Sequence, residues 1–338
     1  MYRLCHHITI GTYRLTLLEK VVIHRSVENL ADTATITLPA AIHGIPISLK
    51  NKKGLQHLPD DDPEGKNLIR PGDGVNIGLG YDNEIKLEFA GYIDDITTTK
   101  DGIEIRCMDE LWNFKNTPVK DEVHGKIRLK QLLERICQQV NPEIKIDCDY
   151  DIGYDKYIIR HSTAYDVLNK IHDELKANIY FDKQTLHCHA PYKDMKKGTA
   201  KFDFARNIES YDLKYIRPQD RPIEVEVIIK YPDGRDDYKA TAGTSGGKKI
   251  SLRAKSENID EAREIAENEY KARCFEGYEG SITGWLIPFV KPTMAVHLHD
   301  KDLPDRDGKY YVIATETTYS RNGGQRKITL GRRLDIQK

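Results

Sequence analysis

Residues 70–112 read RPGDGVNIGLGYDNEIKLEFAGYIDDITTTKDGIEIRCMDELW and contain three short segments in which apolar and polar residues alternate. The segments are Val75–Leu79, Ile85–Phe89 and Ile103–Cys107. Alternation with a period of two is typical of β-strands that bury one face and leave the other in water. The run therefore predicts consecutive strands. Pro71 fixes its own φ angle, so a proline turn is expected to set the register of the first strand.

The chain before this run continues the β pattern. Residues 21–25 are mostly β-branched, and residues 32–39 alternate between apolar residues and threonine. We therefore expect residues 1–116 to form a first β-domain. Residues 50–66 interrupt it with a polar stretch rich in Asp, Gly and Pro, which predicts an exposed excursion that serves assembly rather than folding.

The periodicity changes after residue 116. Between Leu129 and Val140 the apolar residues recur every three or four positions, which predicts an amphipathic helix that ends before Pro142. A second helix is expected after Thr163, a residue that can cap it. Short alternating segments surround both helices, so residues 117–205 are predicted to form a small α+β insert.

Residues 206–338 return to strands. Residues 222–241 predict a hairpin around Pro232-Asp233-Gly234, and residues 310–330 predict another around Arg321–Gly324. One helix is expected between them, capped by Asn258, with acidic residues early and basic residues late. This stretch is therefore interpreted as a second β-domain with one packed helix.

The two β-domains contain similar segments. Residues 70–77, RPGDGVNI, resemble residues 291–298, KPTMAVHL, because both have a basic residue and proline followed by an alternating strand. A Gly-led strand and a final alternating strand follow in each case. We interpret this internal similarity as a duplication, with chance resemblance between strands as the alternative.

Composition excludes several classes of protein. The 338 residues include 52 basic and 53 acidic side chains, and this balance argues against a dedicated nucleic-acid-binding protein. The sequence has neither an apolar run long enough for a membrane helix nor a secretory signal at its start. The cysteines form no CxxC pair, and we expect buried free thiols rather than disulfides at positions Cys5, Cys107, Cys137, Cys148, Cys188 and Cys274.

Paired histidines give the clearest candidate for metal binding. His187 and His189 lie on one face of a predicted strand, and His297 and His299 repeat the spacing. Structural zinc takes four ligands, however, and no second pair lies at a standard distance in the sequence. Histidines on half-exposed strands are the favoured interpretation, so no metal ligand is predicted.

Candidates for catalysis are equally weak. Acidic groups that could supply a general acid and base, or a calcium site, are Asp94-Asp95, Asp147 with Asp149 and Asp151, and Asp236-Asp237. Acids at strand ends and turns are usually solvated. The sequence lacks a nucleophile elbow and a phosphate loop, and Gly243–Lys249 is interpreted as a hairpin loop.

A basic patch near two aromatic residues leaves a nucleic-acid groove open as an alternative to a partner surface or a solvated face. It comprises Lys193, Lys196, Lys197, Lys201 and Arg206, with Phe202 and Phe204. The sequence therefore predicts no catalytic residue and no cofactor, and its 19 tyrosines favour a role in assembly.

The order of segments resembles the baseplate hub proteins of contractile-tailed phages, of the late control D protein type, whose fold also forms the hub part of type VI secretion spike proteins. Phe89–Asp94 and Cys107–Leu111 are similar to that family's FxGxIdxi and cxD patterns, and Gly308–Leu330 resembles its GxYxVxxVxH ending, with Ser320 following where a histidine segment often stands. The resemblance covers nearly the whole chain.

The resemblance implies a mainly β fold, with two tube-type antiparallel β-barrel domains separated by the α+β insert. It also implies a non-enzymatic homotrimer that joins a tail tube to a spike and lines a channel for DNA or effectors. Secretion spike proteins continue into a further barrel and needle, so a chain ending at Lys338 implies a separate spike protein. The expected location is a virion baseplate or an equivalent injection apparatus of phage, prophage or secretion type, made in the bacterial cytoplasm and without membrane insertion. The alternative is a carbohydrate-binding or glycan-hydrolysing accessory protein that uses the acids at residues 147–151.

Overall fold

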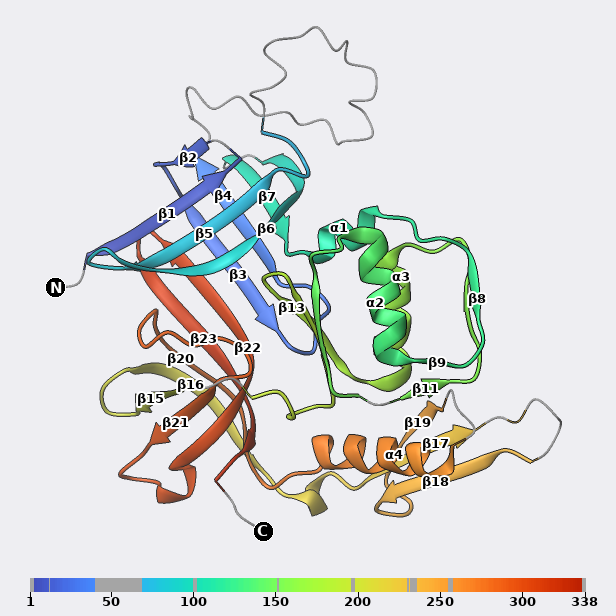
Figure 1. The fold of residues 1–338 in the computed structure, drawn as a ribbon. Helices are drawn as coiled ribbons and strands as arrows, with labels where there is room; N and C mark the ends of the chain where they lie inside the picture. Colours follow the sequence, from blue (N-terminus) through green and yellow to red (C-terminus); the bar gives the residue numbers. More distant parts are fainter. Residues whose placement is uncertain are drawn as a thin grey trace, which may run out of the picture.

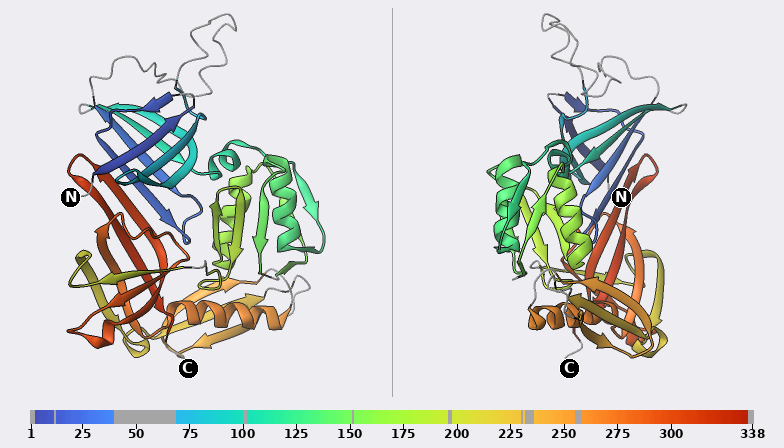
Figure 2. Two further views of the ribbon diagram at one scale, coloured as in Figure 1. Left: turned by 60° about the vertical axis from the view of Figure 1, so that its left-hand side comes forward. Right: turned by 90° about the vertical axis from the view of Figure 1, so that its right-hand side faces the viewer.

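A computed structural model describes residues 3–11, 13–39, 69–99, 102–150, 152–195, 198–229, 231, 236–254 and 258–335. Two β-lobes lie one above the other, a middle unit of helices and short strands lies beside them, and a long helix on a small sheet lies below that unit (Figures 1 and 2). The prediction of a mainly β chain with an α+β insert is confirmed. The predicted excursion at 50–66 lies outside the described residues. Among the described residues, no helix has the length and apolar character needed to cross a membrane.

The first lobe is an antiparallel sheet that curves around its own apolar core (Figure 1). Its strands lie in the spatial order β3-β4-β7-β6-β5-β1-β2. Their bounds are β1 (Leu4–Ile10), β2 (Tyr13–Leu15), β3 (Lys20–Ser26), β4 (Thr33–Pro39), β5 (Gly74–Tyr81), β6 (Glu84–Thr99) and β7 (Gly102–Met108). Every segment that alternation predicted in this region forms a strand.

The second lobe has a separate core and the order β16-β20-β23-β22-β21-β15. Its pairs are antiparallel except for β15 and β21, which run parallel. The bounds are β15 (Thr199–Asp203), β16 (Ile208–Ile216), β20 (Gly277–Trp285), β21 (Ala295–His299), β22 (Gly308–Ser320) and β23 (Gly323–Arg333). The predicted final hairpin is β22–β23, closed at Ser320 and Gly323.

The two lobes are joined by backbone pairing into one thirteen-stranded sheet. The second half of β22 pairs antiparallel with β3 over seven residue pairs, from Ala314 opposite Ser26 to Ser320 opposite Lys20. Tyr319 on β22 reaches the core of the first lobe, and its hydroxyl lies 2.8 Å from the Nδ1 atom of His6. The lobes therefore meet through a strand ladder rather than through surface contacts.

A buried ion pair holds the lobes together behind this ladder. Arg326 on β23 is fully buried, and its Nη2 group donates to the carboxylate of Glu88 on β6. The Nη1 group donates to the carbonyl oxygens of Leu286 at 2.7 Å and Pro288 at 3.3 Å, and Nε donates to Thr317 Oγ1 at 3.3 Å. Burial raises the pKa of Glu88 and lowers that of Arg326, while their mutual attraction opposes both shifts.

The middle unit contains three helices, α1 (Leu111–Asn116), α2 (Leu129–Val140) and α3 (Ala164–Leu175). Its strands are β8 (Glu122–His124), β9 (Ile127–Arg128), β10 (Lys145–Cys148), β11 (Gly153–Tyr154), β12 (Tyr157–Ile159), β13 (Asn178–Asp182) and β14 (Thr185–His189). Both predicted helices are confirmed. Thr163 caps α3, because its side-chain oxygen accepts the Asp166 N–H at 3.2 Å.

A second small sheet lies between β16 and β20 in the sequence. It contains β17 (Ile223–Ile229), β18 (Tyr238–Gly243) and β19 (Lys248–Arg253), followed by α4 (Ile259–Arg273). The predicted hairpin and Asn258 cap are confirmed, although most of the predicted turn lies outside the described residues. Its buried side chains belong to the same apolar core as the middle unit. The division at residues 116 and 205 stays a prediction.

The cxD segment connects the first lobe to the middle unit. Asp109 is buried, and its two carboxylate oxygens accept the backbone N–H groups of Leu111 at 3.0 Å and Asp32 at 2.8 Å. Burial raises the pKa of Asp109. Asp32 in turn pairs with Arg25 at 2.8 Å. The aspartate therefore joins the start of α1 to the loop that follows β3.

Replacing Arg326 with methionine should lower the free energy of unfolding by about 3–5 kcal/mol, because Glu88 is left buried without its partner. Chemical denaturation monitored by circular dichroism measures the loss. Lys327→Met is the matched control, since Lys327 is the exposed neighbour on the same strand. Equal stability of the two variants would contradict the role assigned to the pair, and Glu88→Met combined with Arg326→Met should recover much of the loss.

Replacing Asp109 with alanine should lower the free energy of unfolding by about 1–3 kcal/mol, because the backbone N–H groups of Leu111, at the start of α1, and of Asp32, in the loop after β3, lose their acceptors. Thermal melting compared with Asp95→Ala tests this prediction. Asp95 forms an ion pair with Arg106 at 2.7 Å on the surface, where such pairs contribute little. A smaller decrease in melting temperature for Asp109→Ala than for Asp95→Ala would show that the Asp109 carboxylate does not stabilise the fold.

Candidate functional site: the junction between lobes and its open counterpart

The two lobes repeat one strand order. If the six main strands of each lobe are numbered along the chain, both lobes read 2-3-6-5-4-1 across the sheet. In the first lobe these are β1, β3, β4, β5, β6 and β7, and in the second they are β15, β16, β20, β21, β22 and β23. The topology supports the duplication inferred from the sequence. One difference is the direction of the first strand, since β1 runs antiparallel to β5.

The proline turns have the same hydrogen bonds in both lobes. Ile93 accepts the Gly72 N–H at 2.8 Å and donates to Asp73 O at 2.9 Å, and Val312 makes the same two bonds with Thr293 and Met294 at 2.9 and 3.0 Å. The third residue of each turn, Gly72 or Thr293, has a positive φ angle. This is the geometry of a type II turn with proline at its second position. The turns therefore set equivalent registers, as the sequence predicted.

An irregularity in register recurs at matching positions. In the first lobe, the pairing of β6 with β7 changes register from Ile93 to Asp95 on β6. In the second lobe, the pairing of β22 with β23 changes register from Val312 to Ala314 on β22. Gly91 lies just before the first irregularity, where a Cβ atom would come within 2.2 Å of the Met108 carbonyl oxygen. Only glycine fits this close approach, which accounts for the glycine of the FxGxIdxi pattern.

These matches define an equivalent of the β3–β22 junction. The strand equivalent to β22 is β6, and the strand equivalent to β3 is β16. Among the described residues, β16 pairs with β20 alone, and the β5 partner of β6 ends at Tyr92 while β7 continues to Thr99. Within the described part of the chain, two strand edges therefore have no neighbour, one on each lobe, and they match the two strands of the internal junction.

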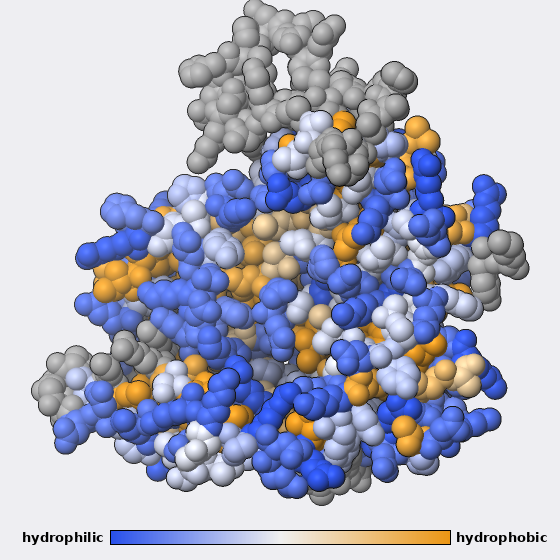
Figure 3. Space-filling model, turned by 180° about the vertical axis from the view of Figure 1, so that it is seen from behind, coloured by the Kyte–Doolittle hydropathy of each residue, from blue (hydrophilic) through white to orange (hydrophobic). Residues whose placement is uncertain are grey.

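The surface of β16 agrees with a missing neighbour. On β3, which pairs with β22, Val21 and Ile23 are fully buried in the core of the first lobe. Pairing with the next strand places Tyr211 and Leu213 at the equivalent positions of β16, and Tyr211 is 53% exposed. Seen from behind, the surface is mostly hydrophilic with separate hydrophobic patches (Figure 3). The position of β16 in the duplicated sheet is therefore what identifies this edge.

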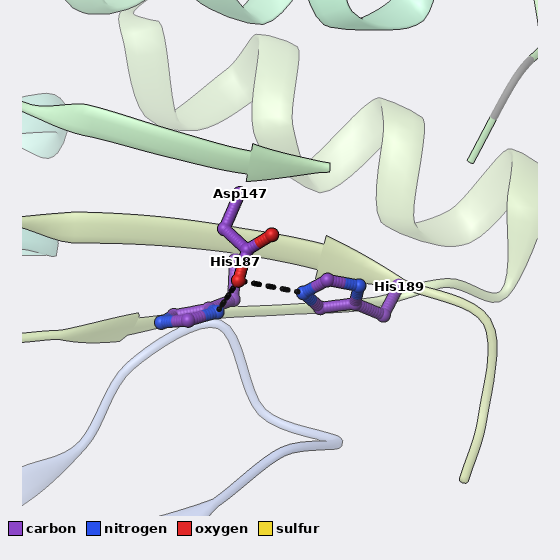
Figure 4. Close-up of side chains that lie close together, drawn as sticks. All are labelled: Asp147, His187 and His189. Carbon is purple, nitrogen blue, oxygen red and sulfur yellow. Dashed lines mark ion pairs between the residues drawn. The ribbon is translucent and has the colours of Figure 1, made fainter. Parts of the chain in front are cut away.

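The structure gathers one set of the predicted candidate residues. Asp147, His187 and His189 lie close together on neighbouring strands β10 and β14 (Figure 4). The sequence singled out the histidines and the acid separately but did not connect them, because forty residues and a helix separate them. Asp149 contacts His189 Nδ1 at 2.8 Å, and Asp151 lies outside the described residues.

The second histidine pair has a different environment. His297 and His299 both lie beside the carboxylate of Asp307, at 3.3 and 2.7 Å. The hydrogen bond from His299 lowers the pKa of Asp307. One carboxylate therefore pairs with both rings.

The other candidates are dispersed. Asp94 pairs with Lys115 at 3.3 Å, and Asp95 pairs with Arg106 on the surface. In the basic patch, Phe202 is buried in the core of the second lobe, and Lys196 and Lys197 lie outside the described residues. All six cysteines are free, as predicted, but only Cys107, Cys137 and Cys188 are fully buried.

Comparison with known proteins finds similar folds among solved structures. No protein-family model and no curated protein sequence matches the chain. Among solved structures, the tail protein from Neisseria meningitidis MC58 has a TM-score of 0.68 at 14% identity, covering 98% of this chain and 97% of that one. The 43 kDa tail protein of prophage MuSo2 from Shewanella oneidensis has a TM-score of 0.62 at 16% identity, with 97% and 96% covered.

The similarity extends to secretion systems. The E. coli c3393 protein, described as a type VI secretion component similar to the T4 tail proteins gp27 and gp5, has a TM-score of 0.60 at 8% identity, with 97% of this chain and 79% of that one covered. These matches confirm the resemblance at the level of the fold. The chain has the fold of these phage tail proteins and of this type VI secretion component.

Proposed function

We propose that three copies of this chain form a ring that joins a tail tube to a central spike in a contractile, phage-tail-like apparatus. The proposed role is structural and non-catalytic. The proposal depends on one observation. The junction between β3 and β22 is paired within the chain, whereas the equivalent edges of β6 and β16 have no neighbour in the described ranges of the chain. A second copy can fill the open junction with the same geometry.

The register of the β3–β22 junction within the chain predicts the register of the proposed β6–β16 junction between copies. At the internal junction, Glu316 lies opposite His24. The matched proline turns and strand pairs make Thr97 equivalent to Glu316, and Lys214 equivalent to His24. We therefore expect Thr97 on β6 to lie opposite Lys214 of the partner subunit, with β6 and β16 antiparallel.

Such a contact is heterologous, because β6 of one copy meets β16 of the next. Heterologous contacts close into rings when the rotation allows it. Here each copy contributes two similar lobes, so three copies present six similar lobes. The ring would then offer an approximately six-fold face to a tube and a three-fold face to a spike, as the hub-like fold implies.

The proposed partners follow from this arrangement. They are further copies of the chain, a tail tube protein and a spike protein, with DNA or effector protein passing through the ring without specific binding. The near-balanced charge, 52 basic against 53 acidic residues, is compatible with such a channel because it gives little net attraction for nucleic acid. The expected location is a tail baseplate or an equivalent injection apparatus.

Tyr211→Asp should raise the concentration needed for trimer formation at least tenfold, because it removes the aromatic ring that the proposed contact buries and places a carboxylate there. The neighbouring Arg306, whose guanidinium lies 5.0 Å from the ring of Tyr211, is already paired with Asp300. Multi-angle light scattering over a concentration series measures the mass. The wild-type chain should approach three times its 38.8-kDa mass. Tyr211→Phe should behave as the wild type.

The control is Val123→Asp, which places the same charge on an apolar side chain that is 60% exposed on β8 of the middle unit. This variant should assemble normally, and all variants should melt at similar temperatures as monomers. A wild-type chain that stays monomeric at the highest concentration, alone and with tube protein, would overturn the proposal. So would a trimer that Tyr211→Asp and Val123→Asp weaken equally.

A further inference from the structure

A cluster of two histidines and one aspartate lies on the sheet of the middle unit, outside the proposed ring contacts. Asp147 on β10 and His187 on β14 are direct neighbours in a parallel strand pair. His189 follows two residues later, so all three side chains project from the same face of the sheet (Figure 4). The imidazoles are buried, whereas the side chain of Asp147 is 56% exposed. The cluster is therefore enclosed by protein and open to solvent at its carboxylate.

The spacing of its ligand atoms fits a tetrahedral metal ion. Asp147 Oδ2 lies 3.2 Å from His187 Nδ1 and 3.6 Å from His189 Nε2, and all three atoms lie within 4.8 Å of one another. Zinc binds nitrogen and oxygen ligands at about 2.0–2.2 Å, which places neighbouring ligands of a tetrahedron about 3.3–3.6 Å apart. Both carboxylate–imidazole distances agree with this geometry.

The environment of His189 also points to a cation. Its Nδ1 atom lies 2.8 Å from Asp149 Oδ1, and the carboxylate can only accept, so Nδ1 carries the proton. In the neutral ring, Nε2 then directs a lone pair towards the Asp147 carboxylate. The side chain is only 6% exposed, and Nε2 has no hydrogen-bond partner among the described residues. A metal ion between the two electron-rich atoms would satisfy both.

The contact with Asp149 has the form of a supporting interaction. Histidines that ligate metals usually donate their other ring N–H to a carboxylate or carbonyl, which fixes the orientation of the ring. The ring of His187 is held differently, stacked on Tyr180 with 4.9 Å between centroids and 7° between planes. Both imidazoles are therefore held in place by neighbouring groups.

A fourth ligand position is available near His187. Asp194 Oδ2 lies 3.7 Å from His187 Nδ1, and the hydroxyl of Tyr180 donates to the same oxygen. Either this carboxylate or a water molecule could serve as the fourth ligand of a tetrahedral metal ion. Two imidazoles with carboxylate suit zinc and similar transition metals, whereas magnesium and calcium prefer ligands that are all oxygen.

We propose that Asp147, His187 and His189 bind one zinc ion, with Asp149 as a positioning residue. The ion would join β10 to β14 and fix the sheet face that meets the lobes, where Tyr180 packs with Val27 and Tyr311. This inference goes beyond the proposed assembly function and does not depend on it, because every ligand comes from a single chain.

Isothermal titration of the metal-stripped, tag-free full chain with ZnCl₂ tests the proposal. We expect one saturable site per chain, unaffected by millimolar Mg²⁺, and a higher melting temperature with zinc. Asp147→Ala should weaken binding at least 100-fold while keeping the circular dichroism spectrum, since its side chain is exposed. Asp149→Asn should weaken binding about 10–100-fold, the usual effect of losing a supporting contact.

The matched control is His299→Ala, taken from the second His-x-His strand, and it should bind zinc as the wild type does. Tyr211→Asp should also bind normally, which separates this test from that of the ring. Zinc that binds equally well to Asp147→Ala would indicate adventitious binding by thiols or surface histidines and would overturn the proposal. Absence of saturable binding to the wild-type chain would do the same.

Discussion

The pairing of β3 with β22 is the contact on which the rest of the structure depends. Seven residue pairs make the two lobes one sheet, so their relative orientation is set by strand geometry. The buried Arg326 adds a condition, because a guanidinium without water must keep its carboxylate and carbonyl partners. Any rotation of one lobe against the other would break these bonds. The lobes are therefore held at one fixed angle, which a closed ring of repeating lobes requires.

Duplication links this fixed junction to the proposed ring. The two lobes share strand order, proline turn and register irregularity, so a contact that forms between the lobes of one chain can also form between chains. The elements that lie outside the two lobes leave the shared strand order intact. The middle unit lies between β7 and β15 in the sequence, and the second small sheet with α4 lies between β16 and β20. Both occupy connections, where insertions are tolerated, and the strand order is unchanged.

Much of the fold was predictable from the sequence, because alternation, proline turns and helix caps are local signals. The junction was not, since β3 has the same pattern whether its neighbour is β4, β22 or solvent. Arg326 offered a signal that was missed. It occupies the inward position of an alternating strand with Ile328 and Leu330, where a charge needs a buried partner. Asp147 was not linked to the histidines because their contact depends on the parallel pairing of β10 with β14, which no local pattern specifies.

Disulfide trapping between copies tests the proposed ring contact most directly. Residues directly opposite on antiparallel strands lie within the range that a disulfide spans. The account predicts that Thr97→Cys and Lys214→Cys, mixed as single variants and oxidised, give a covalent dimer containing one of each. It also predicts that the double variant gives a covalent trimer on a non-reducing gel, with the oxidised wild-type chain as the control for its native thiols. Uncross-linked chains, or dimers formed equally by either variant alone, would contradict the proposed pairing of β6 with β16.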